Sequence, residues 1–346
     1  MHEIDLSKYN IRTDLISDTI DAYNKMDGII IDKEKVDNAE IIRVEVLSEV
    51  PDYLDKKPGK YVTIAFNDVT DIGNRKDVIN VLTKELKGFI KYMKIKKSMK
   101  CLVIGLGNDR STPDSVGPKV IDNIIVTKHI FEVEGIKRNK EYRNVSAFAP
   151  GVFGTSGIET MSIIKGIIKE TSPDFLVIVD ALASTSIDRV NKTVQITDAG
   201  ISPGSGVGNT RGELSFDTLG IPVLALGVPT VVDAVTIVSD TINFMFKKFG
   251  YSINNVNKAS EKLKSVTNVN YLDKDVDMNA ADKRKLLGIL GDLSDEEIKS
   301  LIFEVLTPVG YNLMVTPKEV DFVIDKLSLV IGKAINNALH NQSEKK

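Results

Sequence analysis

A buried strand that runs into a glycine turn is the feature that most constrains how this chain folds. Residues 101–118 read CLVIGLGNDRSTPDSVGP. The apolar residues Cys101–Ile104 predict a buried strand, and Gly105–Asn108 predicts a turn built from residues that tolerate unusual backbone angles. Asp114 comes just before a predicted helix. Because open α/β sheets build their sites at the carboxyl ends of strands, we expect Asp114 at such an edge.

A second segment repeats this arrangement. Phe175–Val179 is another apolar run, and Asp180 follows it in FLVIVDALAS. Two aspartates at two strand ends are expected to meet over one sheet edge. Two close carboxylates do not ionise together easily, so one can hold a proton while the other activates water, which is the chemistry of amide hydrolysis. Three other roles stay open: Asp114 as a helix cap, Asp180 as the start of a turn, or both as metal ligands for which no third ligand is evident.

Strand and helix patterns alternate along most of the chain, which predicts βαβ units. The fold class that follows is α/β, with three layers and a mostly parallel sheet flanked by helices. The predicted strands are 41–47, 61–66, 101–104, 145–149, 175–179, 193–197 and 222–226, and the predicted helices are 78–93, 116–128, 157–170 and 230–248.

The chain is expected to contain an α/β catalytic core, residues 15–255, and a helical C-terminal region, residues 256–340, packed on that core. Two capping-box patterns begin helices in this region, at Ser294 and at Thr316. Residues 1–25 have weak periodicity and are interpreted as an arm rather than core. Residues 341–346 are expected to be a frayed tail.

Composition excludes several classes of function. The chain has 346 residues, three histidines, one cysteine and a net charge of −3. So few histidines disfavour Ser-His-Asp, Cys-His and zinc sites, and the charge gives no reason to expect direct nucleic-acid binding. One cysteine allows no internal disulfide, which fits a cytoplasmic protein.

The N-terminus is polar and no apolar run is long enough to span a membrane, so neither a secretory signal nor a membrane contact is expected. The third glycine of a dinucleotide fingerprint is replaced by Arg110, and no P-loop is present.

A second glycine-rich loop, PGSGVGN, spans residues 203–209. One interpretation is a mobile linker. The other is a loop that closes over an extended substrate or donates N–H groups to a developing oxyanion. The candidate substrate-loop residues are Gly204, Ser205, Gly206, Gly208 and Arg211.

The motifs GLGN-x(3)-TPDS-x-GP, VDALAS, PGSGVGN and LTPVGYNLMVTPKEVD together resemble the germination protease family of spore-forming bacteria, over about residues 5–340. The first motif also resembles, more distantly, the hydrogenase maturation proteases, whose α/β fold the family shares. The resemblance implies an endopeptidase that degrades small acid-soluble spore proteins during germination, in the cytoplasm of the developing spore and the spore core. It also implies an atypical aspartic peptidase, made as an inactive zymogen and assembled as a homotetramer. The family's two aspartates match Asp114 and Asp180. The related maturation proteases bind metal partly through histidine, which no matching motif here offers, so we predict catalysis without metal or other cofactor.

The resemblance further implies substrates cut in a Thr-Glu/Phe-Ala-Ser-Glu-like sequence, after the first acidic residue. Residues 13–18 read TDLISD, with the same order of residue types. We therefore predict self-cleavage between Asp14 and Leu15, which makes residues 1–14 a propeptide. The alternative is an ordinary helix start. The acidic residues of a substrate require a basic partner, for which Arg110, Arg189 and Arg211 are candidates.

Two other functions compete with this hypothesis. The first is a metal-dependent peptidase of the maturation type that uses the same carboxylates. The second is a non-enzymatic spore or DNA-associated binding module, against which the acidic balance argues.

Overall fold

The computed structural model describes residues 15–21, 28–47, 56–133, 141–204, 212–255, 278–306 and 313–340. The described residues form two compact units, one within 15–231 and 316–340 and the other within 232–315. The domain boundaries expected from the sequence stay a prediction. No helix in the described ranges is both long and apolar enough to cross a membrane.

A mixed sheet carries the candidate aspartates. Its strand order is β1-β2-β3-β7-β8-β6-β4-β5, and β9 also pairs with β8. The strands are β1 (Ile29–Val36), β2 (Ala39–Val46), β3 (Gly59–Phe66), β4 (Cys101–Gly105), β5 (Val145–Phe148), β6 (Phe175–Ser184), β7 (Thr193–Thr197), β8 (Val223–Asp233) and β9 (Met314–Val315).

The α/β class with flanking helices is confirmed. Parallel pairing occurs where β4 pairs with β5 and β6, which is the part that carries the candidate aspartates. The pairs β1–β2, β2–β3, β3–β7, β7–β8 and β8–β9 are antiparallel. The first of these is a tight hairpin, in which Val36 pairs with Ala39 across two turn residues, and such a short connection joins only antiparallel strands.

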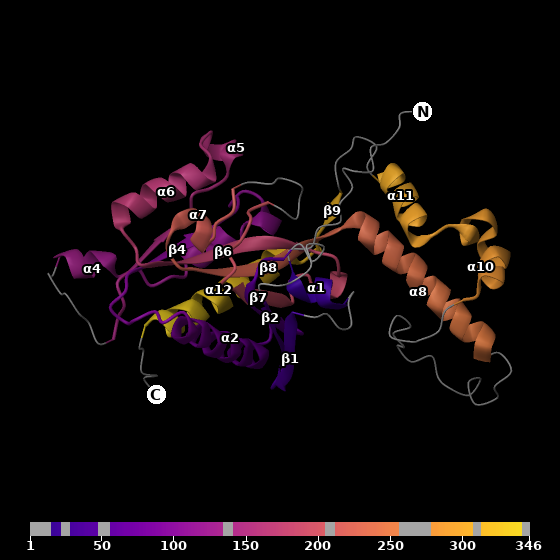
Figure 1. Cartoon of the computed structure of the whole chain (residues 1–346), viewed down its shortest axis with the longest axis horizontal. Coiled ribbons are helices and arrows are strands. Elements are labelled where there is room, and N and C mark those ends of the chain that lie inside the picture. Colours follow the sequence, from indigo (N-terminus) through magenta and orange to yellow (C-terminus); the bar gives the residue numbers. More distant parts are fainter. Residues whose placement is uncertain are drawn as a thin grey trace. The chain divides into compact units, whose positions relative to one another are not determined.

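Helices cover both faces of this sheet, which gives the expected three layers (Figure 1). Apolar residues of α2, α3 and α12 share one core with β3, β4, β6, β7 and β8. On the opposite face, α6 and α7 pack on β4 and β6. The helices are α1 (Ile16–Asp21), α2 (Ile72–Tyr92), η3 (Thr112–Asp114), α3 (Val116–Ile121), α4 (Lys128–Val133), α5 (Phe153–Ser156), α6 (Thr160–Thr171), η4 (Ile187–Arg189), α7 (Phe216–Leu219), α8 (Ala234–Asn255), α10 (Ala280–Leu287), η6 (Gly288–Asp292), α11 (Asp295–Leu306) and α12 (Val320–Leu339).

The single helix predicted over 116–128 is wrong. The structure has α3, a non-helical stretch and then α4. The side chain of Asn336 on α12 accepts a hydrogen bond from the Ile125 amide and donates one to the Asn123 carbonyl. These tertiary bonds satisfy backbone groups that a continuous helix would have used, which is why local periodicity did not predict the break.

The interpretation of residues 1–25 as an arm is wrong for the part that the structure describes. Leu15 and Ile16 are fully buried, and Ile16 packs in a small core with β2 and β3.

One of the two predicted capping boxes is confirmed, because Ser294 and Glu297 bond to each other's backbone amides. The other is not formed, because the Thr316 hydroxyl donates instead to the Thr230 carbonyl.

Candidate active site

The turn after β4 is held against β6 and the start of α3. Gly105 pairs with Val179, and the Leu106 amide donates to the Val179 carbonyl at 2.8 Å. Gly107 has a φ of +115°, and a Cβ there would lie 2.0 Å from the Asp114 carbonyl oxygen. A side chain at this position is therefore excluded twice, by the backbone angle and by the close approach.

Asp114 ends the short helix η3, and its backbone and side chain close this loop. The Asn108 amide donates to both the Asp114 carbonyl oxygen, at 3.0 Å, and the carboxylate Oδ2, at 2.9 Å. The N-cap residue of α3 is Ser115. Asp114 is therefore not the cap of that helix, and its carboxylate, which is half-buried, receives an amide of the glycine turn instead.

Asp180 lies inside β6 rather than at its end, because the strand continues to Ser184. Its side chain is buried, and Oδ1 accepts from the Ala181 amide at 2.9 Å. On β6 the residues Phe175, Val177 and Val179 belong to the core under α12, whereas Leu176 and Ile178 belong to the core under α6. Since side chains alternate along a strand, Asp180 projects on the α6 side of the sheet.

The structure brings the loop that holds Asp114 beside the part of β6 that carries Asp180. Leu106 is bonded to Val179, the neighbour of Asp180, and Asn108, two residues further on, is bonded to Asp114. Helix η3 also contacts β6 directly. In general, two neighbouring carboxylates can act together on a polar bond, because one can keep a proton while the other is ionised.

The remaining sequence candidates fall in different places. Gly204 is described, with a φ of +74°, as part of a turn. Leu15 is fully buried, just before α1. Ser205, Gly206, Gly208, Arg211 and Asp14 lie outside the residues that the structure describes.

Arg189 and Arg110 differ sharply. Arg110 is exposed. Arg189 is mostly buried and its Nε lies 2.7 Å from Oδ1 of Asp18, a carboxylate that is 1% exposed. In the sequence analysis Arg110, Arg189 and Arg211 were equivalent candidates, and no local pattern indicated that Arg189 would pair with Asp18.

The histidines do not approach the aspartates in the described chain. His340 is buried at the end of α12, where its Nδ1 accepts from the Arg143 amide and its Nε2 faces the Ile125 carbonyl. Burial lowers the pKa of His340 to about 4, so the ring is neutral and structural. His129 is exposed on α4. Within the described ranges, no group of three or more His, Cys, Asp or Glu side chains is arranged to hold a metal ion.

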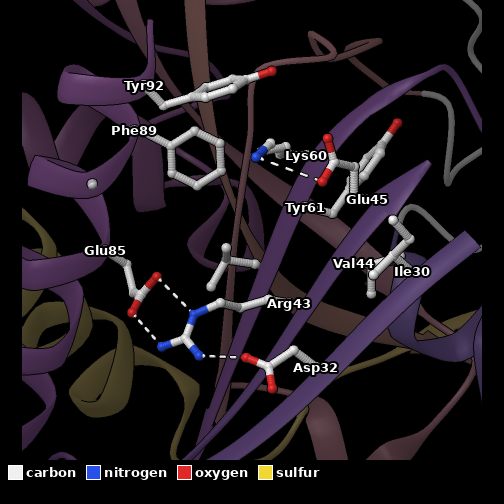
Figure 2. A pocket seen from close by; sticks show the side chains of 12 residues that line it. Ile30, Asp32, Arg43, Val44, Glu45, Lys60, Tyr61, Glu85, Phe89 and Tyr92 are labelled. Atoms are coloured by element: carbon white, nitrogen blue, oxygen red, sulfur yellow. Dashed lines mark hydrogen bonds and ion pairs between the residues drawn. The ribbon is translucent and has the colours of Figure 1, made fainter. Parts of the chain in front are cut away.

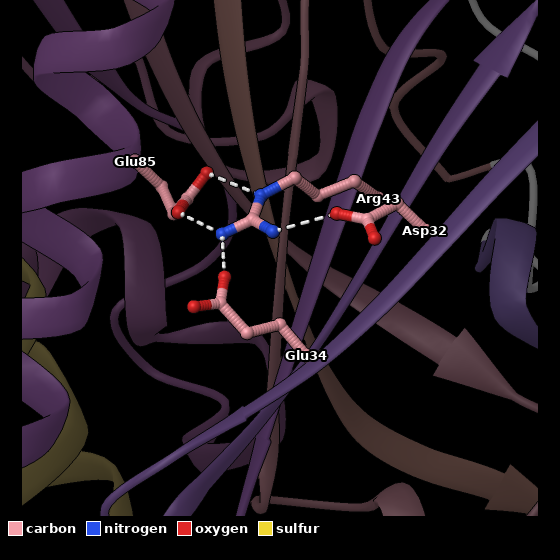
Figure 3. Close-up of polar contacts among 4 residues, drawn as sticks. All are labelled: Asp32, Glu34, Arg43 and Glu85. Carbon is pink, nitrogen blue, oxygen red and sulfur yellow. Dashed lines mark hydrogen bonds and ion pairs between the residues drawn. The ribbon is translucent and has the colours of Figure 1, made fainter.

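A separate cavity of about 310 Å³ lies between β1–β3 and the end of α2 (Figure 2). At its floor Arg43 is surrounded by carboxylates of Asp32, Glu34 and Glu85 at 2.9, 2.7 and 2.7 Å (Figure 3). We call this group the Arg43 cluster. The hydrogen bonds that Arg43 donates to Glu85 are the largest cause that raises the pKa of Arg43. The guanidinium is therefore held by carboxylates of the fold itself.

Comparison with known proteins agrees with the sequence motifs. The family model described as germination protease matches residues 10–346. A germination protease of Geobacillus sp. is 43% identical over 98% of this chain and 96% of its own length. The germination protease of Priestia megaterium has the same identity and coverage. Among solved structures, a [NiFe] hydrogenase maturation protease from Thermococcus kodakarensis aligns with a TM-score of 0.26 and 18% identity, over 38% of this chain and 74% of that one.

Proposed function

The chain belongs to the germination protease family and is therefore a protease, and we propose that it is an endopeptidase that degrades small acid-soluble spore proteins in the germinating spore. We assign the chemistry to Asp114 and Asp180. The observation that carries this assignment is the register of β4 against β6, which puts the glycine turn that binds Asp114 directly beside Asp180.

The proposed reaction is hydrolysis of a peptide bond by water. One carboxylate takes a proton from the water, whose oxygen then bonds to the peptide carbonyl carbon. The other carboxyl group, protonated, donates a hydrogen bond to the carbonyl oxygen and then gives its proton to the leaving nitrogen as the C–N bond breaks. The two aspartates thus end the cycle with their protonation states exchanged: the base now holds a proton and the acid is ionised, and proton exchange with solvent restores the starting pair.

The test is cleavage of a peptide that carries Thr-Glu-Phe-Ala-Ser-Glu. We expect Asp114→Asn and Asp180→Asn each to lower kcat by about 10²- to 10⁴-fold, the usual contribution of a general acid or base. Asp109→Asn is the matched control, since Asp109 is exposed in the same loop. Activity that survives in either variant would remove that aspartate from the mechanism. Activity abolished by a chelator and restored by one metal would favour the metal-dependent alternative.

We also propose that the chain is a zymogen that cuts itself between Asp14 and Leu15. The support is that the sequence after this bond is already bound by the protein, since Leu15 and Ile16 are buried and Asp18 is ion-paired. Intact-mass analysis after mild acid treatment should give a chain that begins at Leu15. A stable product that begins elsewhere would contradict this assignment.

A homotetramer is part of the same proposal. Within the smaller unit, α8 and α11 line an apolar groove of about 330 Å³. Four of its lining side chains, Met245, Leu286, Leu301 and Val305, are 42–75% exposed. Apolar grooves of this kind are commonly covered by a partner, and we propose a second copy of the chain. Light scattering of the wild type and of Val305→Asp, which should dissociate, tests this contact.

A further inference from the structure

The segment that follows the proposed self-cleavage site is docked on the same face of the sheet as Asp180. Leu15 and Ile16 are fully buried, and the Ile16 amide donates to the side-chain oxygen of Gln195 on β7 at 2.7 Å. Ser17 is also buried. A polypeptide segment held in this way has backbone and side-chain contacts that another peptide of similar sequence can reproduce.

The carboxylate of Asp18 lies in a pocket built for an acidic group. Its Oδ1 is 2.7 Å from Arg189 Nε, and its Oδ2 accepts from the Ser184 hydroxyl at 3.0 Å and from the Thr185 amide at 2.9 Å. One cation and two neutral donors therefore converge on a carboxylate that is 1% exposed. Charge-assisted hydrogen bonds in a desolvated site distinguish a carboxylate from an amide of the same shape.

The distance between this pocket and Asp180 follows from the geometry of β6. Ser184 is four residues after Asp180 on β6, and the alternation of side chains puts both on the α6 side of the sheet. Four strand residues span about 13 Å. An extended peptide covers the same distance in four residues, so an acidic residue in the pocket would put the bond four positions earlier beside Asp180.

The docked segment runs in the same direction as β6. Ile16 is bonded to Gln195, which pairs with Gly227, and Gly227 lies directly against the side chain of Leu182. Asp18, two residues after Ile16, is bonded to Ser184, two residues after Leu182. The docked segment and β6 therefore run in the same direction along the sheet.

We infer that Arg189, Ser184 and Thr185 form the subsite for an acidic residue four positions after the cleaved bond, and that the chain's own Asp18 occupies this subsite. The inference rests on the proposed endopeptidase function. The number of residues matches the sequence, since Asp18 is four positions after Asp14, the residue before the proposed cut. The span of about 13 Å applies to an extended substrate and not to the docked segment itself. Residues 16–21 are helical here, whereas a substrate in the register described above is extended, so a substrate must displace the docked segment.

The experiment compares cleavage of three peptides by the chain that begins at Leu15, because the full chain is proposed to be an inactive zymogen. The first has the sequence of residues 10–21, NIRTDLISDTID, and the other two carry Asp18→Asn or Asp21→Asn. For the wild type we expect Asp18→Asn in the peptide to lower kcat/KM by about 10- to 100-fold, because the peptide loses its charge-assisted contacts in the pocket. We expect Asp21→Asn in the peptide to change kcat/KM less than about 3-fold. In Arg189→Gln protein the Asp18→Asn penalty should shrink to less than about 3-fold. Arg43→Gln protein is the control, and should discriminate like the wild type.

The outcomes separate this inference from the function on which it rests. Wild-type protein that cuts no peptide would reject the proposed function, and the subsite with it. Wild-type protein that cuts, with Arg189→Gln discriminating as strongly, would reject the subsite alone. If circular dichroism shows that Arg189→Gln does not fold, Ser184→Ala replaces it and should reduce the discrimination by about 3- to 10-fold, the net effect of one ordinary hydrogen bond. Unchanged discrimination in Ser184→Ala would then overturn the inference.

Discussion

Two arginines of this protein meet carboxylates in very different settings. Arg43 is 27% exposed and binds three carboxylates from β1 and α2, of which Asp32 and Glu34 are themselves 66% and 41% exposed. Arg189 is 16% exposed and pairs with Asp18, which is 1% exposed and belongs to the segment that follows the proposed cleavage site. Water screens the first group and barely reaches the second.

The difference shows which ion pair the fold can do without. Around Arg43, the carboxylates that lose the guanidinium keep access to water or to the open cavity of Figure 2. Around Asp18, the loss of Arg189 removes a cation from a buried carboxylate. A buried pair is costly to break and is weak evidence for stability as such, so its presence calls for a functional reason. Recognition of an acidic residue supplies that reason.

The largest expected effect is on kcat, and it distinguishes Asp180 from the Arg43 cluster. Asp180→Asn should lower kcat by about 10²- to 10⁴-fold because it removes a proton-transfer group, whereas Glu85→Gln in the Arg43 cluster should change kcat less than about 3-fold. The measurement is single-substrate kinetics with the peptide of residues 10–21. An equal loss in both variants would mean that activity reports the integrity of the fold, and the distinction between the two regions would fail.

The next effect is on stability. Arg189→Gln should lower the free energy of unfolding by about 3 kcal/mol, since it breaks a buried pair, whereas Arg43→Gln should lower it by about 1 kcal/mol. Urea unfolding followed by circular dichroism measures both, with intact mass used to verify that each chain is uncut. The opposite order would show that the Arg43 cluster, and not the Asp18 pocket, is the more strongly coupled to the fold.

These contrasts also show what the sequence could predict. Strand β4, which leads into the loop of Asp114, and strand β6, which carries Asp180, follow from uninterrupted apolar runs. Their neighbouring positions follow from the rule that open α/β sheets build sites near the carboxyl ends of strands. Strand β1 was not predicted because it is mostly exposed and its IIIDKEKV pattern does not alternate. The end of β6 was placed too early, since Asp180 reads as a turn residue although the strand buries it.

The Asp18 pocket was beyond local sequence patterns for a different reason. Arg110, Arg189 and Arg211 were equivalent in the sequence, and only the tertiary fold brings one of them to a carboxylate far away in the chain. Leu15 and Ile16 read as part of an arm because two apolar residues define no period. Their burial depends on β2 and β3, which supply the surface that covers them.

The third prediction concerns acid, which we expect to act through His340 and not through Arg43 or Arg189. Burial lowers the pKa of His340 from 6.5 to about 4. Between these values the unfolded chain binds a proton that the folded chain does not, so this group adds stability above pH 6.5 that is lost as pH falls to 4. The loss amounts to about 3 kcal/mol. Urea midpoints at pH 7 and pH 4.5 should show a smaller acid loss in His340→Gln than in the wild type. His129→Gln, at an exposed position, should retain the full slope, and a slope unchanged in His340→Gln would place the acid sensitivity elsewhere.

The smallest effect lies inside the Arg43 cluster and tests whether its members act independently. Asp32 is 66% exposed and Glu85 is 11% exposed, although both contact the same guanidinium (Figure 3). Asp32→Asn should therefore lower the free energy of unfolding by less than about 0.5 kcal/mol, and high salt should abolish the difference, because exposed ion pairs are screened. Glu85→Gln should cost about 1 kcal/mol, with little dependence on salt. If Asp32→Asn costs as much as Glu85→Gln, the three carboxylates hold Arg43 as one cooperative network, and the cluster resembles the buried Asp18 pocket more than its exposure suggests.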